Sequence, residues 1–187
     1  MRFRLLVAIA TCALGLAACR GEGSTAGCPS AEPAGTPIAA PVMAFLSAAR
    51  ALHHEADMHE KSGDAPGAIG ALERLVALQA PQAAEVNEVL ADAHARLAEL
   101  RLGRGDLEGA DRDVGAGLQR VQGPTYFRGH LLEVQGLVEE ARAASLSDAG
   151  RADEAARART RAMALLEEAV RTQEQVIEHA LADGGQP

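Results

Sequence analysis

The chain has 187 residues and a formal net charge of −8, with 48% hydrophobic, 24% charged and only 2% aromatic residues. The apolar share is sufficient for a packed core and argues against a wholly disordered chain. The scarcity of aromatic residues argues against a β-sandwich or barrel, whose strands are enriched in them. The acidic balance and the single lysine, Lys61, argue against a nucleic-acid partner, because phosphate contacts need clustered Lys and Arg.

Residues 1–18 have the organisation of a secretory signal peptide. Two arginines precede an apolar run over residues 5–18, which is shorter than the roughly 20 apolar residues that a membrane-spanning helix needs. The run leads into Leu16-Ala17-Ala18-Cys19, which resembles the lipobox of bacterial lipoproteins. The resemblance implies that Cys19 is acylated and anchors the protein in the cell envelope. Arg20, next in the chain, implies the outer membrane, with the protein facing the periplasm. The alternative is an ordinary cleaved signal peptide with an incidental cysteine.

Residues 19–41 combine Cys19 with a stretch rich in Gly, Pro, Ser, Thr and Ala, a composition that predicts a flexible linker. The folded domain is then expected over residues 42–183. If Cys19 is acylated, Cys28 has no partner within the mature chain, and it either pairs between chains or has no role.

From Pro41 onward, apolar residues recur at helical spacing, and they predict six helices and an all-α fold. The six runs extend over residues 45–56, 69–76, 86–100, 107–118, 127–141 and 163–177. Gly63-Asp64 and Gly105-Asp106 each join a C-terminal glycine to an N-cap aspartate. Pro81 and Pro124 are expected in the first turns of the helices that follow them.

The breaks between helices repeat along the chain. Turn glycines recur at Gly63, Gly105 and Gly150, and each is followed by an alanine that opens a second helix, at Ala68, Ala110 and Ala155. A period in this range predicts stacked helical hairpins. Over residues 49–165 the pattern resembles the tetratricopeptide repeat (TPR), with Ala56, Ala98 and Ala143 at its small position, although the period exceeds the usual length of about 34 residues.

This resemblance implies a solenoid of three stacked antiparallel hairpins that binds a protein or peptide in a groove lined by the first helix of each hairpin. A plain six-helix bundle is the alternative. The tail after Ala162, with Met163, Leu166, Val170 and Ile177 at its apolar positions, is expected to cap the array. Its charged face should be solvated and should include an ion pair between Glu167 and Arg171.

The densest polar cluster lies between His53 and Glu60. Helical spacing places His53, Asp57 and Glu60 on one face, where imidazole and carboxylates could form a metal site. A solvated polar face is the alternative interpretation. No activated nucleophile or acid–base pair stands out, so the sequence predicts neither an enzyme nor a cofactor.

Helix phase alone places His53, Asp57, Glu60, Arg101 and Arg142 in the expected groove. Tyr126 either packs at a helix start or forms an exposed hot spot for binding. The sequence therefore predicts a membrane-anchored periplasmic scaffold or adaptor lipoprotein that binds a protein partner. A metal-binding or metal-sensing lipoprotein that uses the His53–Glu60 cluster is the alternative.

Overall fold

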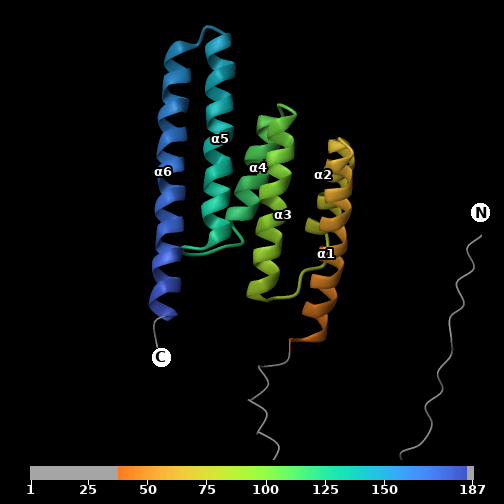
Figure 1. Cartoon of the computed structure of the whole chain (residues 1–187). Coiled ribbons are helices and arrows are strands. Elements are labelled where there is room, and N and C mark those ends of the chain that lie inside the picture. Colours follow the sequence, from red (N-terminus) through yellow and green to blue (C-terminus); the bar gives the residue numbers. More distant parts are fainter. Residues whose placement is uncertain (1–37, 185–187) are drawn as a thin grey trace, which may run out of the picture. The chain divides into compact units, whose positions relative to one another are not determined.

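The computed structural model describes residues 38–184, so the predicted signal peptide, Cys19 and most of the predicted linker lie outside the described residues. The described part is all-helical, with six helices and no strand, which confirms the predicted fold class (Figure 1). The helices are α1 (Ala40–Lys61), α2 (Ala65–Val76), α3 (Ala84–Gly103), α4 (Leu107–Leu118), α5 (Tyr126–Asp148) and α6 (Ala152–Asp183).

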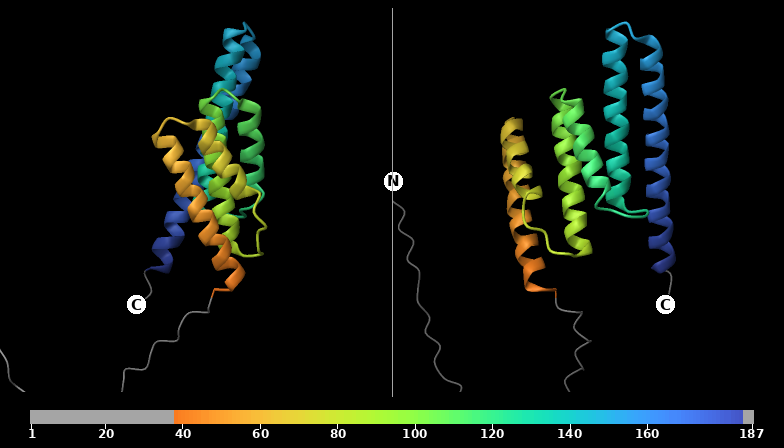
Figure 2. Two further views of the ribbon diagram at one scale, coloured as in Figure 1. Left: turned by 90° about the vertical axis from the view of Figure 1, so that its right-hand side faces the viewer. Right: turned by 180° about the vertical axis from the view of Figure 1, so that it is seen from behind.

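Consecutive helices pair as three hairpins, α1–α2, α3–α4 and α5–α6, which lie side by side with α1 and α2 at one end and α6 at the other (Figures 1 and 2). Helix α3 also packs against α1 and α2, and α5 packs against α3 and α4. Within residues 38–184, no helix contacts another that is more than two elements away along the chain. None of these helices combines the length and the hydropathy needed to cross a membrane.

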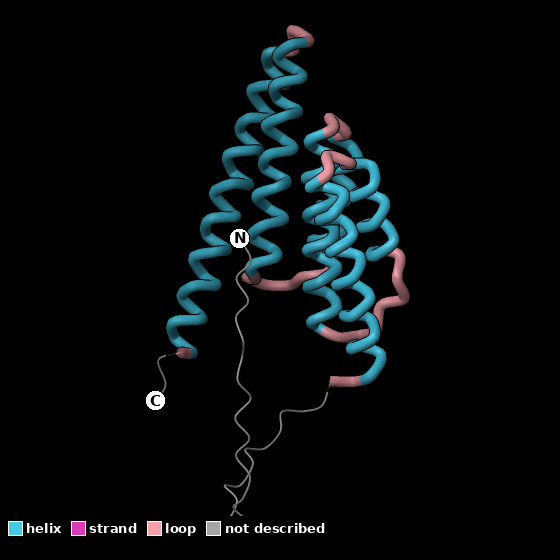
Figure 3. The backbone as a smooth tube through the Cα atoms, turned by 45° about the vertical axis from the view of Figure 1, so that its right-hand side comes forward, coloured by secondary structure: helices cyan, strands magenta, loops and turns pink. Residues whose placement is uncertain are grey.

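The hairpin turns follow the sequence prediction. Gly63, Gly105 and Gly150 have φ values of 77°, 77° and 73°, a left-handed conformation that glycine adopts without steric cost. At the next helix, the Asp64 carboxylate accepts a hydrogen bond from a backbone N–H at 3.0 Å, and the Asp106 carboxylate does the same at 2.9 Å. The first two turns are therefore capped, and the helices of each hairpin are joined by a short loop (Figure 3).

Helix starts differ from the prediction at three prolines. Helix α1 begins at Ala40, within the predicted linker, because Pro41 fits the first helical turn. Helices α3 and α5 begin only after Pro81 and Pro124, which lie in the preceding loops. At α5 the cap is Thr125, whose hydroxyl accepts a hydrogen bond from the Arg128 N–H at 3.1 Å.

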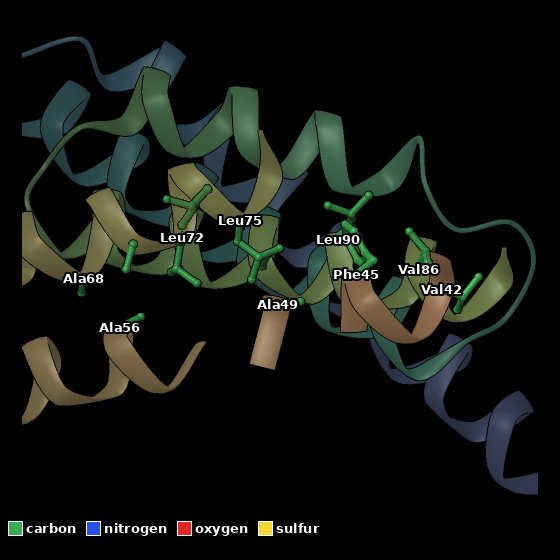
Figure 4. Packing of buried hydrophobic residues seen from close by; sticks show 12 residues of the cluster. Val42, Phe45, Ala49, Ala56, Ala68, Leu72, Leu75, Val86 and Leu90 are labelled. Carbon is green, nitrogen blue, oxygen red and sulfur yellow. The ribbon is translucent and has the colours of Figure 1, made fainter. Parts of the chain in front are cut away.

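The main core joins α1, α2 and α3 and is built from leucine, valine and alanine around Phe45 (Figure 4). The alanines expected at the helix crossings are buried in every hairpin, at 0–1% exposure: Ala56, Ala68, Ala98, Ala110, Ala143 and Ala155. Small side chains at these crossings let the helix backbones approach closely, which accounts for a core with few aromatic residues.

Helix α6 packs on α5 mainly through its alanines; of the four apolar residues predicted on it, Leu166 lies against α5 and the other three are exposed. Alanines, together with Thr172, are buried on the side that meets α5, at positions 155, 158, 162 and 169. Met163, Val170 and Ile177 are instead 63%, 55% and 58% exposed. The physical reason is that α5 carries glycines at 129 and 136 opposite α6, where they make room for Gln173 and Leu166 and for the α6 backbone at Ala162 and Ala169.

The predicted ion pair on α6 is also wrong. Among the described residues, Glu167 and Arg171 form no ion pair; the neighbouring Glu168 lies 3.7 Å from Arg128 of α5 instead.

Candidate functional site

A guanidinium from α3 organises the polar cluster that the sequence placed on α1. Arg96 donates hydrogen bonds to Asp57 at 2.8 Å and to Glu60 at 2.5 Å, and its other terminal nitrogen lies 3.1 Å from His53 Nδ1. The structure therefore brings the three predicted residues His53, Asp57 and Glu60 together. The cation that joins them was missed in the sequence, since Arg96 lies a hairpin away along the chain.

The roles of the two His53 nitrogens follow from this contact. A guanidinium can only donate, so Nδ1 accepts the bond from Arg96 and the ring proton lies on Nε2. Nε2 faces Asp92 of α3 at 3.7 Å. Burial is the main cause that lowers the pKa of His53, with the nearby Arg96 acting in the same direction and Asp92 opposing both. His53 is therefore favoured in its neutral form.

The Arg96 cluster does not favour the metal-binding interpretation. A metal ion at this place would compete with Arg96, which already bonds His53 Nδ1 and one carboxylate oxygen each of Asp57 and Glu60. Although burial opposes it, hydrogen bonding to the two carboxylates raises the pKa of Arg96, so this cation stays charged. Within residues 38–184, no group of three or more His, Cys, Asp or Glu side chains is arranged to hold a metal ion.

Beside this cluster lies an open hollow of about 410 Å³. Its lining comes only from the first helix of each hairpin. Helix α1 contributes Leu46, Ala49, Arg50 and His53, helix α3 contributes Val89 and Asp92, and helix α5 contributes Phe127. The surface is mainly apolar, with an arginine, an imidazole and a carboxylate at its edge. Such a site can accept an apolar side chain and a polar backbone together.

Aromatic and imidazole side chains of α5 extend from the hollow. Tyr126 is 60% exposed, and its ring packs edge-to-face on Phe127, with ring centroids 5.6 Å apart. His130 lies 3.0 Å from a carboxylate oxygen of Glu99 on α3. The hydrogen bond to Glu99 is the main cause that raises the pKa of His130, against the opposing effect of burial. Tyr126 is thus on the surface rather than in the core.

Arg101 and Arg142 do not lie with the other predicted groove residues. Arg101 binds Asp113 of α4 and also Glu73 of α2, the latter at 2.5 Å. Arg142 binds Glu139 on its own helix and lies 3.4 Å from an Asp111 oxygen of α4. Both arginines therefore contact the second helices, whereas the hollow is lined by the first. Helix phase does not show which helix lies opposite a given face, so these contacts could not be predicted from it.

The carboxylates held by these arginines are among the most buried charges of the described chain. Asp113 and Glu139 side chains are 10% and 9% exposed. Glu139 also accepts a hydrogen bond from Arg161 of α6 at 2.8 Å, and His94 Nδ1 lies 3.6 Å from Asp113. These contacts fix neighbouring helices to one another, so we assign them a structural role.

The sequence was also compared with protein-family models and with curated proteins, and none of them matches it. The likeness to the tetratricopeptide repeat therefore stays a prediction from the turn and alanine pattern.

Proposed function

We propose that this chain is a membrane-anchored scaffold lipoprotein of the cell envelope that binds a protein or peptide in the periplasm and performs no catalysis. The anchor is Cys19, and the binding surface is the hollow between α1, α3 and α5. The anchor and the location rest on the sequence pattern at residues 1–19.

The observation that carries the binding role is the composition of the hollow. It presents an apolar surface of leucine, alanine, valine and phenylalanine to solvent, on the face formed by the first helices. Arg50 and Asp92 at its edge can pair with charges or backbone groups of a bound segment. Tyr126 extends the surface with a large, exposed side chain of the type enriched at binding hot spots.

The test is site-specific photocrosslinking in cells that express the full chain. A photoreactive amino acid is placed at Arg50, Asp92 or Tyr126 in the hollow and its edge, and at the exposed positions Arg112 and Gln119 on α4 and just after it as controls. The proposal expects one discrete protein adduct, identified by mass spectrometry, from the three positions around the hollow and none from the controls. Equal labelling at all five positions, or no adduct at any of them, would contradict it.

A point variant then separates binding from anchoring. Arg50→Glu reverses a charge at the edge of the hollow without touching the core, because Arg50 is exposed. The variant should lose the adduct at Tyr126 while remaining in the membrane fraction. Replacing Arg101 or Arg142 is not a suitable test, since the first change would leave the buried Asp113 without its guanidinium and the second would remove one of the two arginines that bind the buried Glu139.

A further inference from the structure

We propose that the last hairpin carries a second binding surface, which takes a basic amphipathic helix of a partner protein. This surface goes beyond the hollow of the proposed function and lies on α5 and α6. It is formed by exposed apolar side chains in two rows, one on each helix, and we call it the α5–α6 strip. Its members are Tyr126 and Leu137 on α5 and Met163, Val170 and Ile177 on α6.

Two glycines of α5 show which sides of the two helices face each other. A Cβ on Gly129 would meet the Gln173 side chain of α6, and a Cβ on Gly136 would meet the Leu166 side chain. Residue numbers therefore fall along α6 as they rise along α5, so the two helices are antiparallel. These contacts fix the line from which the position of every other side chain on the hairpin can be measured.

The two apolar rows lie on the same side of this line. At about 100° per residue, the α5 row lies about a quarter turn from the two glycines, and Arg128 and Glu139 lie about a quarter turn from them in the opposite direction. On α6, the apolar row lies about a quarter turn from the alanines that face α5, with Arg161 and Glu168 on the opposite side. Arg128 lies 3.7 Å from Glu168. Arg161 donates a hydrogen bond to Glu139 at 2.8 Å. The ion-paired sides of the two helices thus coincide, so the opposite sides, which carry the apolar rows, coincide as well.

The α5–α6 strip is long enough to hold a helix, and it begins at the edge of the hollow. Ile177 follows Met163 by fourteen residues, which is about 21 Å along α6 at about 1.5 Å per residue. A bound helix of about four turns would cover this length. At the other row, the Tyr126 ring packs edge-to-face on Phe127, which lines the hollow.

The last hairpin is also the one whose two helices share no third helix. Helix α3 packs against both α1 and α2, and α5 packs against both α3 and α4. Within residues 38–184, α6 contacts only α5, and no helix contacts both of them (Figure 1). A partner helix on the α5–α6 strip would contact both helices of its hairpin, as α3 and α5 do on the hairpins before them.

The charged residues around the α5–α6 strip are mainly acidic. The exposed carboxylates beside the two rows are Glu133, Glu140, Glu167, Glu174 and Glu178. Two arginines are also near, Arg159 at the end beside Met163 and Arg171 on the outer edge of α6. His130, on the same side of α5, is bonded to Glu99 of α3. Carboxylates therefore outnumber cations, and the complementary occupant is cationic.

The same charges argue against two other occupants. A second copy of the chain would bring like charge, since the sequence has 26 Asp and Glu against 18 Lys and Arg. A lipid surface with anionic headgroups would be repelled in the same way. A helix with apolar side chains on one face and Lys or Arg beside them matches both the apolar rows and the acidic residues around them.

The test is site-specific photocrosslinking in cells that express the full chain. A photoreactive amino acid is placed at Met163 on the α5–α6 strip, and at Arg157 on the far side of α6 as a control. Mass spectrometry of the adduct identifies the crosslinked segment of the partner. The proposal expects a segment with apolar residues at helical spacing and more Lys and Arg than Asp and Glu, and it expects no adduct at Arg157.

One double variant tests the apolar contact. Leu137→Gln with Val170→Gln removes one large apolar side chain from each row and should lower the adduct yield at Met163 at least about tenfold. Both residues are exposed, and glutamine keeps a high helix propensity, so the fold should be retained. Far-UV circular dichroism of the purified variant establishes that it is folded.

A second double variant tests the charge. Glu133→Gln with Glu174→Gln removes one carboxylate beside each row and should lower the adduct yield about threefold. Glu108→Gln with Asp153→Asn removes the same charge from exposed positions away from the strip and should leave the yield unchanged. Equal losses in these two variants would contradict the charge argument.

Several other outcomes would overturn the proposal. An adduct with another copy of the chain, with a phospholipid or with a partner segment of net negative charge would each assign a different occupant. Equal adducts at Met163 and Arg157, or none at Met163, would show that the strip is not the binding surface. An adduct at Arg50 in the hollow without one at Met163 would overturn this inference alone and leave the proposed function intact.

Discussion

Arg101→Leu tests whether the buried ion pairs hold the helices together. Arg101 joins Asp113 of α4 to Glu73 of α2, and its side chain is 19% exposed while that of Asp113 is 10% exposed. Leucine keeps the helix propensity and most of the apolar stem but removes the charge. The Asp113 carboxylate is then left without its cation.

The size of the effect follows from burial. Removing one partner of a buried ion pair costs about 3–5 kcal/mol, because the remaining charge is desolvated and uncompensated. Arg74→Leu is the matched control, since the Arg74 and Glu55 side chains are 56% and 43% exposed. An exposed pair of this kind contributes about 0–1 kcal/mol. Arg101→Leu with Asp113→Asn should recover at least half of the loss, because the buried charge is gone.

The assay is urea unfolding of the full chain, followed by far-UV circular dichroism, because the chain has one Tyr and no Trp for fluorescence. With a slope of about 2 kcal/mol per M, Arg101→Leu should lower the midpoint by about 2 M and Arg74→Leu by less than about 0.5 M. Equal shifts in the two variants would refute the reasoning, since burial would then not determine the cost.

Three further predictions concern packing, pH and anchoring. In α4, Gly117→Ala should destabilise the folded chain by about 1–3 kcal/mol, because the new Cβ would lie 2.6 Å from a buried leucine of α5. Gly115→Ala meets open space and should stabilise the folded chain by up to about 1 kcal/mol. Urea midpoints that move in the same direction for both variants would contradict this contrast. The pKa of His130 is higher in the folded chain than in the unfolded chain. Protonated His130 therefore adds to the free energy of unfolding below about pH 6.5, and this stabilisation is lost as the pH rises through the folded-state pKa. Thermal unfolding of His130→Gln should therefore show a larger loss at about pH 6 than at pH 8, and Glu99→Gln should abolish that difference. Cys19→Ser should abolish incorporation of radiolabelled fatty acid, and retained label would disprove acylation at this residue.

Local features of the fold could be predicted from the sequence. The turns at Gly63 and Gly105 depend on a left-handed glycine and on an aspartate one position later, so all the needed information lies within a few residues. The crossing alanines could be predicted for the same reason, because small residues recur at fixed distances from each turn. The number of helices followed from the helical spacing of apolar residues, and the turns agreed with it.

Contacts between helices could not be predicted. Arg96 binds a cluster on α1 that lies 36 to 43 positions earlier, and no local pattern marks it. On α6, apolar spacing indicated a helix correctly but did not show which face would meet α5. The glycines at 129 and 136 decided that, because they make room for Gln173 and Leu166 and let the α6 backbone approach at Ala162 and Ala169. The exposed residues Met163 and Val170 are the consequence.

The restriction of helix packing to near neighbours along the chain bears on how the protein forms. A chain in which every described contact joins adjacent or next-but-one helices has short loops to close, which favours rapid folding. If the N-terminal signal directs export, the chain would emerge from the translocation channel with α1 first. Each hairpin could then fold as soon as its second helix is released, so that α1 and α2 would be packed before α6 leaves the channel.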